Sequence, residues 1–410
     1  SDSLPHSALD FLSPLADGAD QLFAAQVLRL RADSPDPSRI RLLVPLPVPL
    51  SEYCALQGQG EGSGFEQRIA PLLQQADAVF VIPEVELDCG ACLDAPDVQY
   101  ARLARYLAIH AQLVVAVWDG VPGQAAPGGT LDLVQALLGG FERNRDARSA
   151  RRLASPDFGR VLHVATRRMN GGAAAPAAAG RALHALSADG GDEDPHACIL
   201  HAGGELDELN RRHRAAMSGS SSYAGRLTAV RDAVLSSVDA ADTAPDGVLA
   251  ALAHSFAVAD LQAERAKRGW RRAWGVTVLA AVLASSSSLL RLLLGERYGA
   301  LVETASYATG AGLAIGCYLW VARSGRRNAY LCYRALAEGL RVQIAWLASG
   351  SAALASDHYL IKQRGDAGWV RDTLDALTVG PPPETRSPSA VARGWISSQL
   401  AYLAGPNIMR

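Results

Sequence analysis

Two glycine-containing segments of this sequence have the residue types of a phosphate-binding loop. The first runs from Ser13 to Asp20 (SPLADGAD), between a short apolar segment and a region of helical spacing. A glycine turn at a helix start exposes backbone N–H groups, which suit an anionic phosphate. Asp17 or Asp20 would cap that helix or accept hydrogen bonds from a ribose, although a simple capped turn explains the same residues. The residues assigned to this part of the site are Leu15, Ala16, Asp17, Gly18 and Asp20.

The second segment follows the most strongly strand-like run of the chain, residues 113–118. Asp119 lies at the end of that run, and residues 127–130 (PGGT) open the next helical stretch. Free N–H donors, close backbone approach and a hydroxyl are the parts of a phosphate cradle, and Asp119 would meet a sugar or a base edge. A loop that merely requires glycine is the alternative. The residues assigned here are Trp118, Asp119, Gly120, Gly128, Gly129, Thr130 and Asp132, with Pro83 and Glu84 after the apolar run 78–82.

Cysteine and histidine spacing gives little support for a metal or for catalysis. Cys89 and Cys92 form a lone CxxC pair, and zinc would need two more ligands. His196, Cys198 and His201 are close in sequence but adjoin a flexible stretch. No nucleophile–base pair is recognisable. We therefore expect a ligand-binding site without a metal and assign no catalytic residue.

The elements that would position the glycine segments alternate between strands and helices. Strands are expected at 10–13, 39–45, 78–82, 113–118 and 160–166, and helices at 19–31, 65–76, 97–110 and 131–138. Near-continuous apolar strands between helices predict a parallel sheet covered on both faces. Ligands bind outside the carboxyl ends of such strands, where both glycine segments fall. In the first helix, Leu22, Phe23, Val27 and Leu30 share one predicted apolar face.

Two charge-free stretches, 273–290 and 304–322, mark the second half of the chain. A bilayer-spanning helix needs about 20 mainly apolar residues, so the two stretches predict a transmembrane hairpin. Two buried helices of a large soluble core are the alternative. The positive-inside rule places both ends of the hairpin in the cytosol and its short loop outside. The basic residues that flank the two stretches are Lys267, Arg268, Arg271, Arg272, Arg323, Arg326 and Arg327.

Length and composition limit the remaining possibilities. A chain of 410 residues predicts two or three domains. The net charge of -2 gives no global attraction to nucleic acid, and we expect no direct nucleic-acid binding. Six cysteines are few for this length and form no disulfide framework, which indicates a reducing, cytosolic setting for most of the chain. The expected domains are residues 1–170 for ligand binding, 171–203 as a linker and 204–410 as a helical domain.

The residues of the first domain resemble a known family. The segments SPLADGADQLFA (Ser13 to Ala24) and VAVWDGVPGQAAPGGTLDLV (Val115 to Val134) look like the SLOG family of Rossmann-like nucleotide-binding domains, over about residues 1–170. The resemblance implies a nucleotide or nucleotide-derived second messenger as the ligand. Family members usually carry an earlier strand and glycine loop before Ala8, so we expect a truncated start. Cytokinin-activating relatives have a PGGxGTxxE pattern, whereas PGGTLD here lacks the intervening glycine, which argues for binding and against hydrolysis.

From about Asn210 to its end, the chain resembles the SMODS- and SLOG-associating 2TM effector domain. The hairpin carries this resemblance together with the segments YRALAEGLRVQIAWLASG (333–350), DHYLIKQRGDAGWVRDTL (357–374) and WISSQLAYL (395–403). The expected fold is therefore an α/β, Rossmann-like domain followed by an all-α domain with a two-helix transmembrane hairpin.

The two resemblances together imply a function and a location. They suggest a multi-pass protein of the bacterial inner membrane, active in antiphage defence. Its partners would be the lipid bilayer, a small nucleotide and further copies of the chain, which oligomerise to permeabilise the membrane. Two alternatives are a membrane-tethered nucleotide-processing enzyme, which needs a carboxylate acid or base, and an anchor without a ligand.

Overall fold

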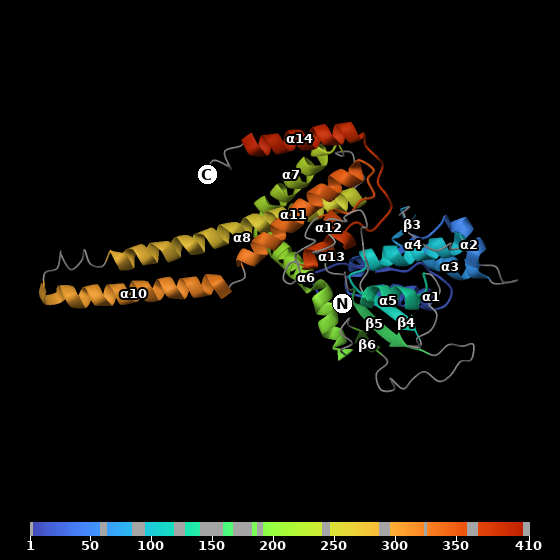
Figure 1. Cartoon of the computed structure of the whole chain (residues 1–410), viewed down its shortest axis with the longest axis horizontal. Coiled ribbons are helices and arrows are strands. Elements are labelled where there is room, and N and C mark those ends of the chain that lie inside the picture. Colours follow the sequence, from blue (N-terminus) through green and yellow to red (C-terminus); the bar gives the residue numbers. More distant parts are fainter. Residues whose placement is uncertain are drawn as a thin grey trace. The chain divides into compact units, whose positions relative to one another are not determined.

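A computed structural model shows an α/β part followed by a mostly helical part (Figure 1). It describes residues 3–57, 64–83, 95–118, 128–139, 159–166, 183–186, 192–239, 247–286, 296–323, 326–358 and 368–404. The strands are β1 (Leu9–Leu12), β2 (Ile40–Leu46), β3 (Ala78–Val81), β4 (Val114–Trp118), β5 (Val161–Ala165), β6 (Leu183–Leu186) and β7 (Asp192–Glu193). The helices of the first part are α1 (Ala19–Ala32), η1 (Pro37–Arg39), α2 (Leu50–Gln57), α3 (Phe65–Leu73), α4 (Ala95–His110) and α5 (Thr130–Gly139).

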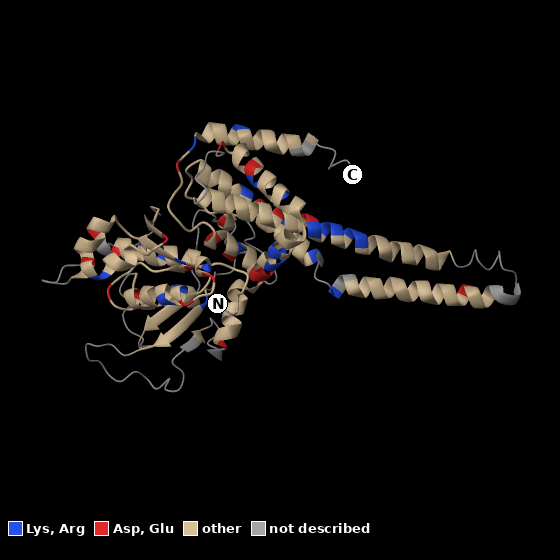
Figure 2. Ribbon diagram, turned by 180° about the vertical axis from the view of Figure 1, so that it is seen from behind, with Lys and Arg blue, Asp and Glu red and all other residues tan. Residues whose placement is uncertain are grey.

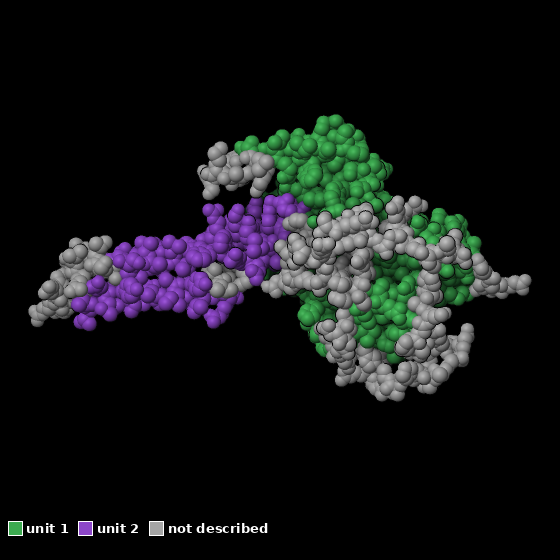
Figure 3. All heavy atoms as spheres, in the orientation of Figure 1, with its two compact units in different colours: residues 1–255, 339–410 green, residues 256–338 purple. Residues whose placement is uncertain are grey.

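The later part of the chain is mostly helical. They are α6 (Pro195–Gly219), α7 (Ser221–Ser237), α8 (Val248–Ser285), α10 (Glu296–Arg323), α11 (Arg326–Ala348), α12 (Ala355–His358), α13 (Gly368–Ala376) and α14 (Pro388–Ala404). The chain divides into two compact units, unit 1 with residues 1–255 and 339–410, and unit 2 with Phe256–Glu338 (Figure 3). This division differs from the three consecutive domains expected from the sequence, because the chain leaves unit 1 within α8 and returns to it within α11.

The strands form two hydrogen-bonded sheets within the described ranges. In the first sheet, β1, β2 and β3 are all parallel, in the order β1-β2-β3. In the second sheet, β4 is parallel to β5, but β5 pairs with β6 and β6 with β7 in antiparallel fashion. The prediction of one parallel sheet is therefore wrong in these details. The range 171–203, expected as a linker, supplies β6, β7 and the start of α6.

The core of the first sheet is centred on β2. All residues of β2 except Arg41 are buried, because elements cover both faces of the strand. Helix α1 packs on this core through Ala24 and Val27. Leu22, in contrast, has 69% of its surface exposed and lies about 200° from Ala24 around the helix. Leu30 is exposed as well, so the predicted apolar face of this helix is wrong at two of its four positions.

Contacts within unit 1 join the α/β part to the helical part. Helix α13 packs against both α4 and α6. At the end of α4, His110 Nδ1 lies 2.7 Å from the backbone oxygen of Asp375. Beside β5, Arg160 Nη1 lies 3.0 Å from the carboxylate of Asp372. Both partners belong to α13, so this short helix contacts the α/β part at two points.

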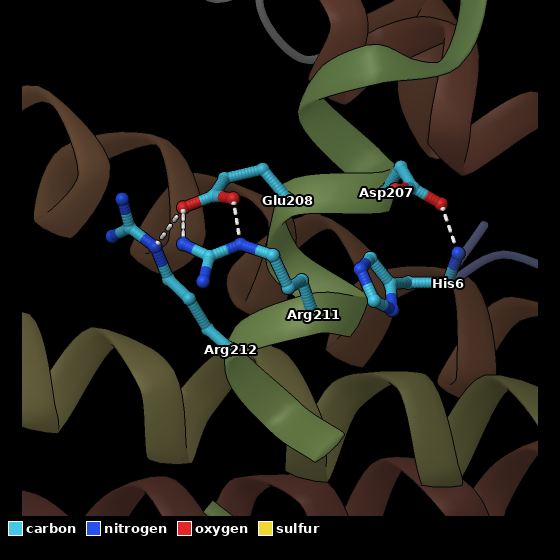
Figure 4. Close-up of polar contacts among 5 residues, drawn as sticks. All are labelled: His6, Asp207, Glu208, Arg211 and Arg212. Atoms are coloured by element: carbon cyan, nitrogen blue, oxygen red, sulfur yellow. Dashed lines mark hydrogen bonds and ion pairs between the residues drawn. The ribbon is translucent and has the colours of Figure 1, made fainter. Parts of the chain in front are cut away.

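The N-terminal segment is also fixed to α6. The backbone N–H of His6 donates to Asp207 Oδ1 at 2.7 Å, and the Asp207 side chain is buried (Figure 4). Gly203 allows this approach, because a Cβ atom there would lie 2.7 Å from the Leu4 side chain. The α/β part is therefore held to the helical part from its first described residues onward.

Unit 2 contains a long antiparallel helix pair, which we call the arm: residues 267–286 of α8 and 296–323 of α10 (Figure 1). The pairing is fixed by Trp274 against Tyr318, with ring centroids 6.4 Å apart, and by the close approach of Gly310 to Ala284. At the base of the arm, Arg334 Nη1 lies 2.6 Å from Asp260 Oδ1.

The apolar residues of the arm are arranged with the small side chains inside. Ala273, Thr277 and Ala284 are buried along one face of α8, and Gly310 is buried on α10. The large apolar side chains are exposed, and of these Trp274 and Tyr318 also contact each other across the pair: Trp274, Val276, Val278, Leu279, Val282, Leu283, Leu301, Tyr307, Leu313, Ile315, Tyr318, Leu319 and Trp320. Over the residues that the structure describes, no helix combines the length and the apolarity required to cross a membrane. Residues 287–290, the end of the first charge-free stretch, lie outside those residues.

Candidate functional site

The first predicted loop connects β1 to α1 and is held by Ser13. The buried Ser13 hydroxyl donates to the backbone oxygen of Asp20 at 2.9 Å and also accepts a hydrogen bond from the Leu15 N–H at 3.4 Å. Leu15 is fully buried and has a φ of 58°, which is uncommon for a residue with a side chain. Gly18, with a φ of 98°, is the N-cap residue of α1. The loop therefore has a fixed shape that ends at a helix N-terminus.

The two aspartates of this loop have separate roles, and neither caps the helix. Asp17 Oδ1 lies 3.0 Å from Arg68 Nη2 of α3. Asp20 accepts a hydrogen bond from the backbone of Ala16, and burial raises the pKa of its carboxyl from 3.8 to about 6. Because its N-cap is a glycine without a side-chain bond, α1 begins with backbone N–H groups that no capping side chain covers. That end of α1 suits a polar or anionic group.

Tyr53, on α2, adds a polar group that the sequence analysis did not identify. Its side chain is fully buried, and its hydroxyl has no hydrogen-bond partner among the described residues. Burial raises the pKa of Tyr53, and the negative charges of Tyr100 and Asp20 raise it further. Tyr100 packs against the same core that contains Tyr53. An unpartnered buried hydroxyl costs about 1–3 kcal/mol. A ligand or water that bonded to Tyr53 would remove this cost.

Tyr100, on α4, connects Tyr53 and its neighbours to the second predicted loop. Its hydroxyl accepts a hydrogen bond from Gln57 Nε2 at 2.5 Å. Its backbone contacts the loop so closely that a Cβ atom on Gly128 would lie 2.2 Å from the Tyr100 carbonyl carbon. Gly128 also has a φ of 73°, so only glycine fits this position without strain. The two loops that the sequence proposed are thus joined through one helix.

The second loop differs in detail from a phosphate cradle. The Gly128 N–H donates to Asp132 Oδ2 at 2.9 Å, so this donor is already used. Gly129 begins the hydrogen bonding of α5, and the Thr130 side chain is exposed. Trp118 ends β4 with its indole Nε1 buried and without a partner in the described part of the chain. Trp118 is therefore a second orphaned donor at a strand end.

Several predicted residues cannot be placed in this site. Pro83 follows β3 and is partly exposed, and none of the hydrogen bonds described above involves it. Glu84, Asp119 and Gly120 lie outside the described residues. The residues that sequence reasoning missed, Tyr53, Gln57 and Tyr100, come from α2 and α4. Tyr53 and Gln57 lie on the short polar-apolar helix after β2, LSEYCALQ, which the sequence analysis did not propose. Tyr100 lies on a helix that was expected, at residues 97–110.

The described residues also bear on the metal hypotheses. Cys89 and Cys92 lie outside these residues. Cys198 is buried in the core beneath β5 and β6, and His196 Nδ1 lies 3.0 Å from the Ser3 hydroxyl. Across the described ranges, no group of three histidine, cysteine or acidic side chains is placed to hold a metal ion.

Comparisons with known proteins leave the family open. No protein-family model matches the chain, and no curated protein or solved structure matches it either. The likeness to the SLOG and 2TM families therefore rests on the sequence segments quoted above and stays a prediction.

Proposed function

We propose that this protein is a membrane effector. Its α/β part binds a nucleotide-derived signal, its arm inserts into the bacterial inner membrane, and several copies assemble there and permeabilise the membrane. The observation that carries this proposal is the inverted arrangement of the arm, with small side chains between the helices and large apolar side chains outside.

The inverted arrangement is costly in water. Each square ångström of apolar surface left in water forgoes about 25 cal/mol, and soluble proteins rarely expose a contiguous apolar patch of more than a few hundred Å². In lipid, outward leucine and valine side chains are solvated by acyl chains, and small residues such as Ala284 and Gly310 allow close helix packing. No charged residue occurs in 273–290 or 304–322. A bilayer is therefore the solvent that suits this pair of helices.

Permeabilisation requires more than one copy. A single hairpin has two helices and cannot enclose a pore, so several hairpins must come together. A ligand can drive this step only by binding the assembled state more tightly than the separate chains. The Tyr53 hydroxyl and the Trp118 indole N–H, which have no hydrogen-bond partner among the described residues, support a ligand at the α/β part, as does the uncapped start of α1. The assignment of that ligand as a nucleotide, and the role in antiphage defence, come from the SLOG and 2TM resemblance.

A vesicle-leakage assay tests the proposal. The full chain is added to dye-loaded vesicles of bacterial lipid, with and without a panel of cyclic and linear nucleotides. We expect one or more nucleotides to start leakage. The double variant Leu279→Gln/Leu283→Gln should abolish it, whereas Leu22→Gln, an exposed leucine of the α/β part, should leave it unchanged. No nucleotide-dependent leakage at any oligomeric state would overturn the proposal.

A second candidate function, a membrane-tethered enzyme that hydrolyses a nucleotide at its glycosidic bond, is favoured by Asp20. A general acid or base works best with a pKa near the working pH, and burial brings the pKa of Asp20 to about 6. Two other carboxylates of the described loops are less suitable, because Asp17 is paired with Arg68 and Asp132 accepts from Gly128. Release of free base from AMP or NAD, abolished by Asp20→Asn, would establish this function. An equal rate in the Asp20→Asn protein would exclude Asp20 as the catalytic group.

A further inference from the structure

The base of the arm carries a band of basic residues next to the exposed apolar surface. The members of this basic band, which come from α8, α10 and α11, are Lys267, Arg268, Arg271, Arg272, Arg323 and Arg327. All six side chains are exposed. Figure 2 shows the α8 part of the band as a run of blue where the arm begins. Six cations at one end of a helix pair form a site for anions.

The two helices bring the band together in space. Lys267 Nζ lies 5.9 Å from the centre of the Tyr330 ring, so the first residue of the band on α8 faces α11. Trp274 and Tyr318 pack edge to face about two helical turns beyond Lys267 along the arm. The cations that follow α10 therefore lie at the same end of the arm as those of α8.

Acidic side chains do not neutralise the band. Among the described residues, no ion pair joins any of its six members to an aspartate or glutamate. The nearby acidic residues Asp260 and Glu338 are both paired with Arg334 instead. Glu264 is exposed one turn before the band, and its backbone oxygen accepts from Arg268. The charge of the band is therefore available to an external anion.

Aromatic side chains lie between the band and the apolar surface. Trp274, Tyr318 and Trp320 are exposed at this level, and Trp270, within the band itself, is partly exposed. Tryptophan and tyrosine gather at the level of lipid headgroups, because their rings are amphipathic. Basic residues favour the phosphate layer just outside that level. Along the arm, cations are followed by aromatic rings and then by leucine and valine. This order matches the phosphate layer, the headgroup boundary and the acyl chains of one bilayer leaflet.

We propose that the basic band binds the headgroups of anionic phospholipids and thereby sets the depth of the arm in the membrane. This inference rests on the proposed membrane function and adds the lipid class and the residues that recognise it. Guanidinium groups suit phosphate because their planar donors bind two oxygens at once. Free inorganic phosphate has the same oxygens but no acyl chains, so the apolar surface beside the band favours the lipid as the source.

A vesicle-partition experiment tests the inference with the full chain. The protein is titrated with vesicles of phosphatidylcholine alone, or of equal parts phosphatidylcholine and phosphatidylglycerol, at low salt. We expect tighter binding to the phosphatidylglycerol vesicles. Arg271→Gln/Arg272→Gln should weaken that binding by roughly thirtyfold, since each cation near an anionic surface contributes about a factor of five. Binding to phosphatidylcholine vesicles should change little.

Two further variants separate charge from folding. Arg271→Lys/Arg272→Lys keeps the charges and should retain most of the preference for phosphatidylglycerol. Arg29→Gln/Arg214→Gln removes two exposed arginines of unit 1 and should retain all of it. Excess inorganic phosphate should not compete with the vesicles beyond its effect on ionic strength.

The outcomes are distinct. If the protein binds both kinds of vesicle equally, or if the glutamine variant keeps the preference, the headgroup inference is overturned while the membrane function stands. If specific competition by inorganic phosphate removes the preference, the band is a site for free anions and the inference fails. If the protein binds neither kind of vesicle, the proposed membrane function fails with it.

Discussion

The α/β core and the arm use apolar residues in opposite ways. In the core, Leu42 and Val44 of β2 are fully buried. In the arm, alanine and glycine are buried, while Leu279 and Leu283 have 58% and 63% of their surface exposed. Water drives large apolar side chains inward, whereas lipid removes that drive and leaves close packing of small residues as the main attraction between helices. Under the proposed membrane function, the two regions would fold against different solvents.

The largest expected effect is the difference in stability between truncating a leucine in the core and truncating one in the arm. Leu42→Ala should lower the free energy of unfolding by about 3 kcal/mol, because it leaves a cavity in a fully buried site. Leu283→Ala should change it by less than about 0.5 kcal/mol, because its side chain is already exposed. Denaturant titration of both variants in one mild detergent measures the difference. Equal losses would show that Leu283 is packed and would remove the contrast between the regions.

Glycine substitutions test whether the arm helices are in close contact through their small residues. A Cβ atom on Gly310 would lie 2.6 Å from the Ala284 Cβ, whereas one on Gly312 would meet nothing within 4 Å. Gly310→Val should therefore destabilise the arm by about 2 kcal/mol relative to Gly312→Val, since the helix propensity change is the same at both positions. Thermal unfolding followed by helical circular dichroism provides the measurement. Similar behaviour of the two variants would mean that the helices are not in close contact at Ala284.

The strands and helices of the α/β part were largely predictable, because their signal is local. Residues 39–45 and 78–82 were expected as strands, and the structure has β2 at Ile40–Leu46 and β3 at Ala78–Val81. The antiparallel addition of β6 to β5 was not predictable, because that pairing joins distant residues and the preceding Ala/Pro/Gly-rich segment reads as a linker. Leu22 misled the prediction of the buried face, since periodicity alone does not say which side of a helix meets the sheet.

The candidate site was predictable only in part. The loop with Gly18 follows a strand and opens a helix, as the sequence indicated. The meeting of Tyr53 and Tyr100 at one core depends on how α2 and α4 pack, and no local pattern encodes it. The occupation of the Gly128 N–H by Asp132 is likewise a matter of side-chain geometry. Residue types thus located the loops, while tertiary packing decided which polar groups remain without a partner.

Asp20 provides a pH test of the α/β part. Its folded pKa of about 6 lies above the ordinary value of 3.8, so burying the neutral form stabilises the fold below pH 3.8. That contribution is lost as the pH rises through about 6. As the pH is lowered from 7 to 4, we expect the free energy of unfolding of the wild type to rise by about 1.5 kcal/mol relative to that of Asp20→Asn. This value is discounted for partial exposure of the side chain. Paired denaturant titrations across this range measure it, and a constant difference between the two proteins would contradict the raised pKa.

The affinity for a ligand at Asp20 should depend on pH, with a sign set by the polar group that the ligand places there. A ligand that accepts a hydrogen bond from Asp20 favours the protonated carboxyl and binds better below pH 6, whereas a ligand that donates to it binds better above pH 6. The sign of the pH dependence of binding therefore reports which kind of polar group the ligand places at Asp20. Asp20→Asn should remove that dependence in either case, and a dependence that persists would assign it to another group.

A substitution of Glu208, on α6, should have the smallest effect on the free energy of unfolding. The pH dependence of its contribution has the opposite sign to that of Asp20. Arg211 and Arg212 both donate to its carboxylate and lower its pKa from 4.5 to about 2 (Figure 4). The stabilisation is therefore present above pH 4.5 and is lost as the pH falls through about 2. Because Glu208 is partly solvated, Glu208→Gln should cost no more than about 1 kcal/mol at pH 7.

The salt dependence of the Glu208 variant completes the contrast with the arm. The difference between wild type and Glu208→Gln should shrink in high salt, because the three side chains of this cluster share an ion-pair network at the surface of α6. The described apolar stretches of the arm contain no such network, and its packing should be insensitive to salt. Denaturant titrations of Glu208→Gln and Gly310→Val at low and high salt compare the two directly. A salt-sensitive Gly310→Val deficit would mean that charged groups, and not small-residue contacts, hold the arm helices together.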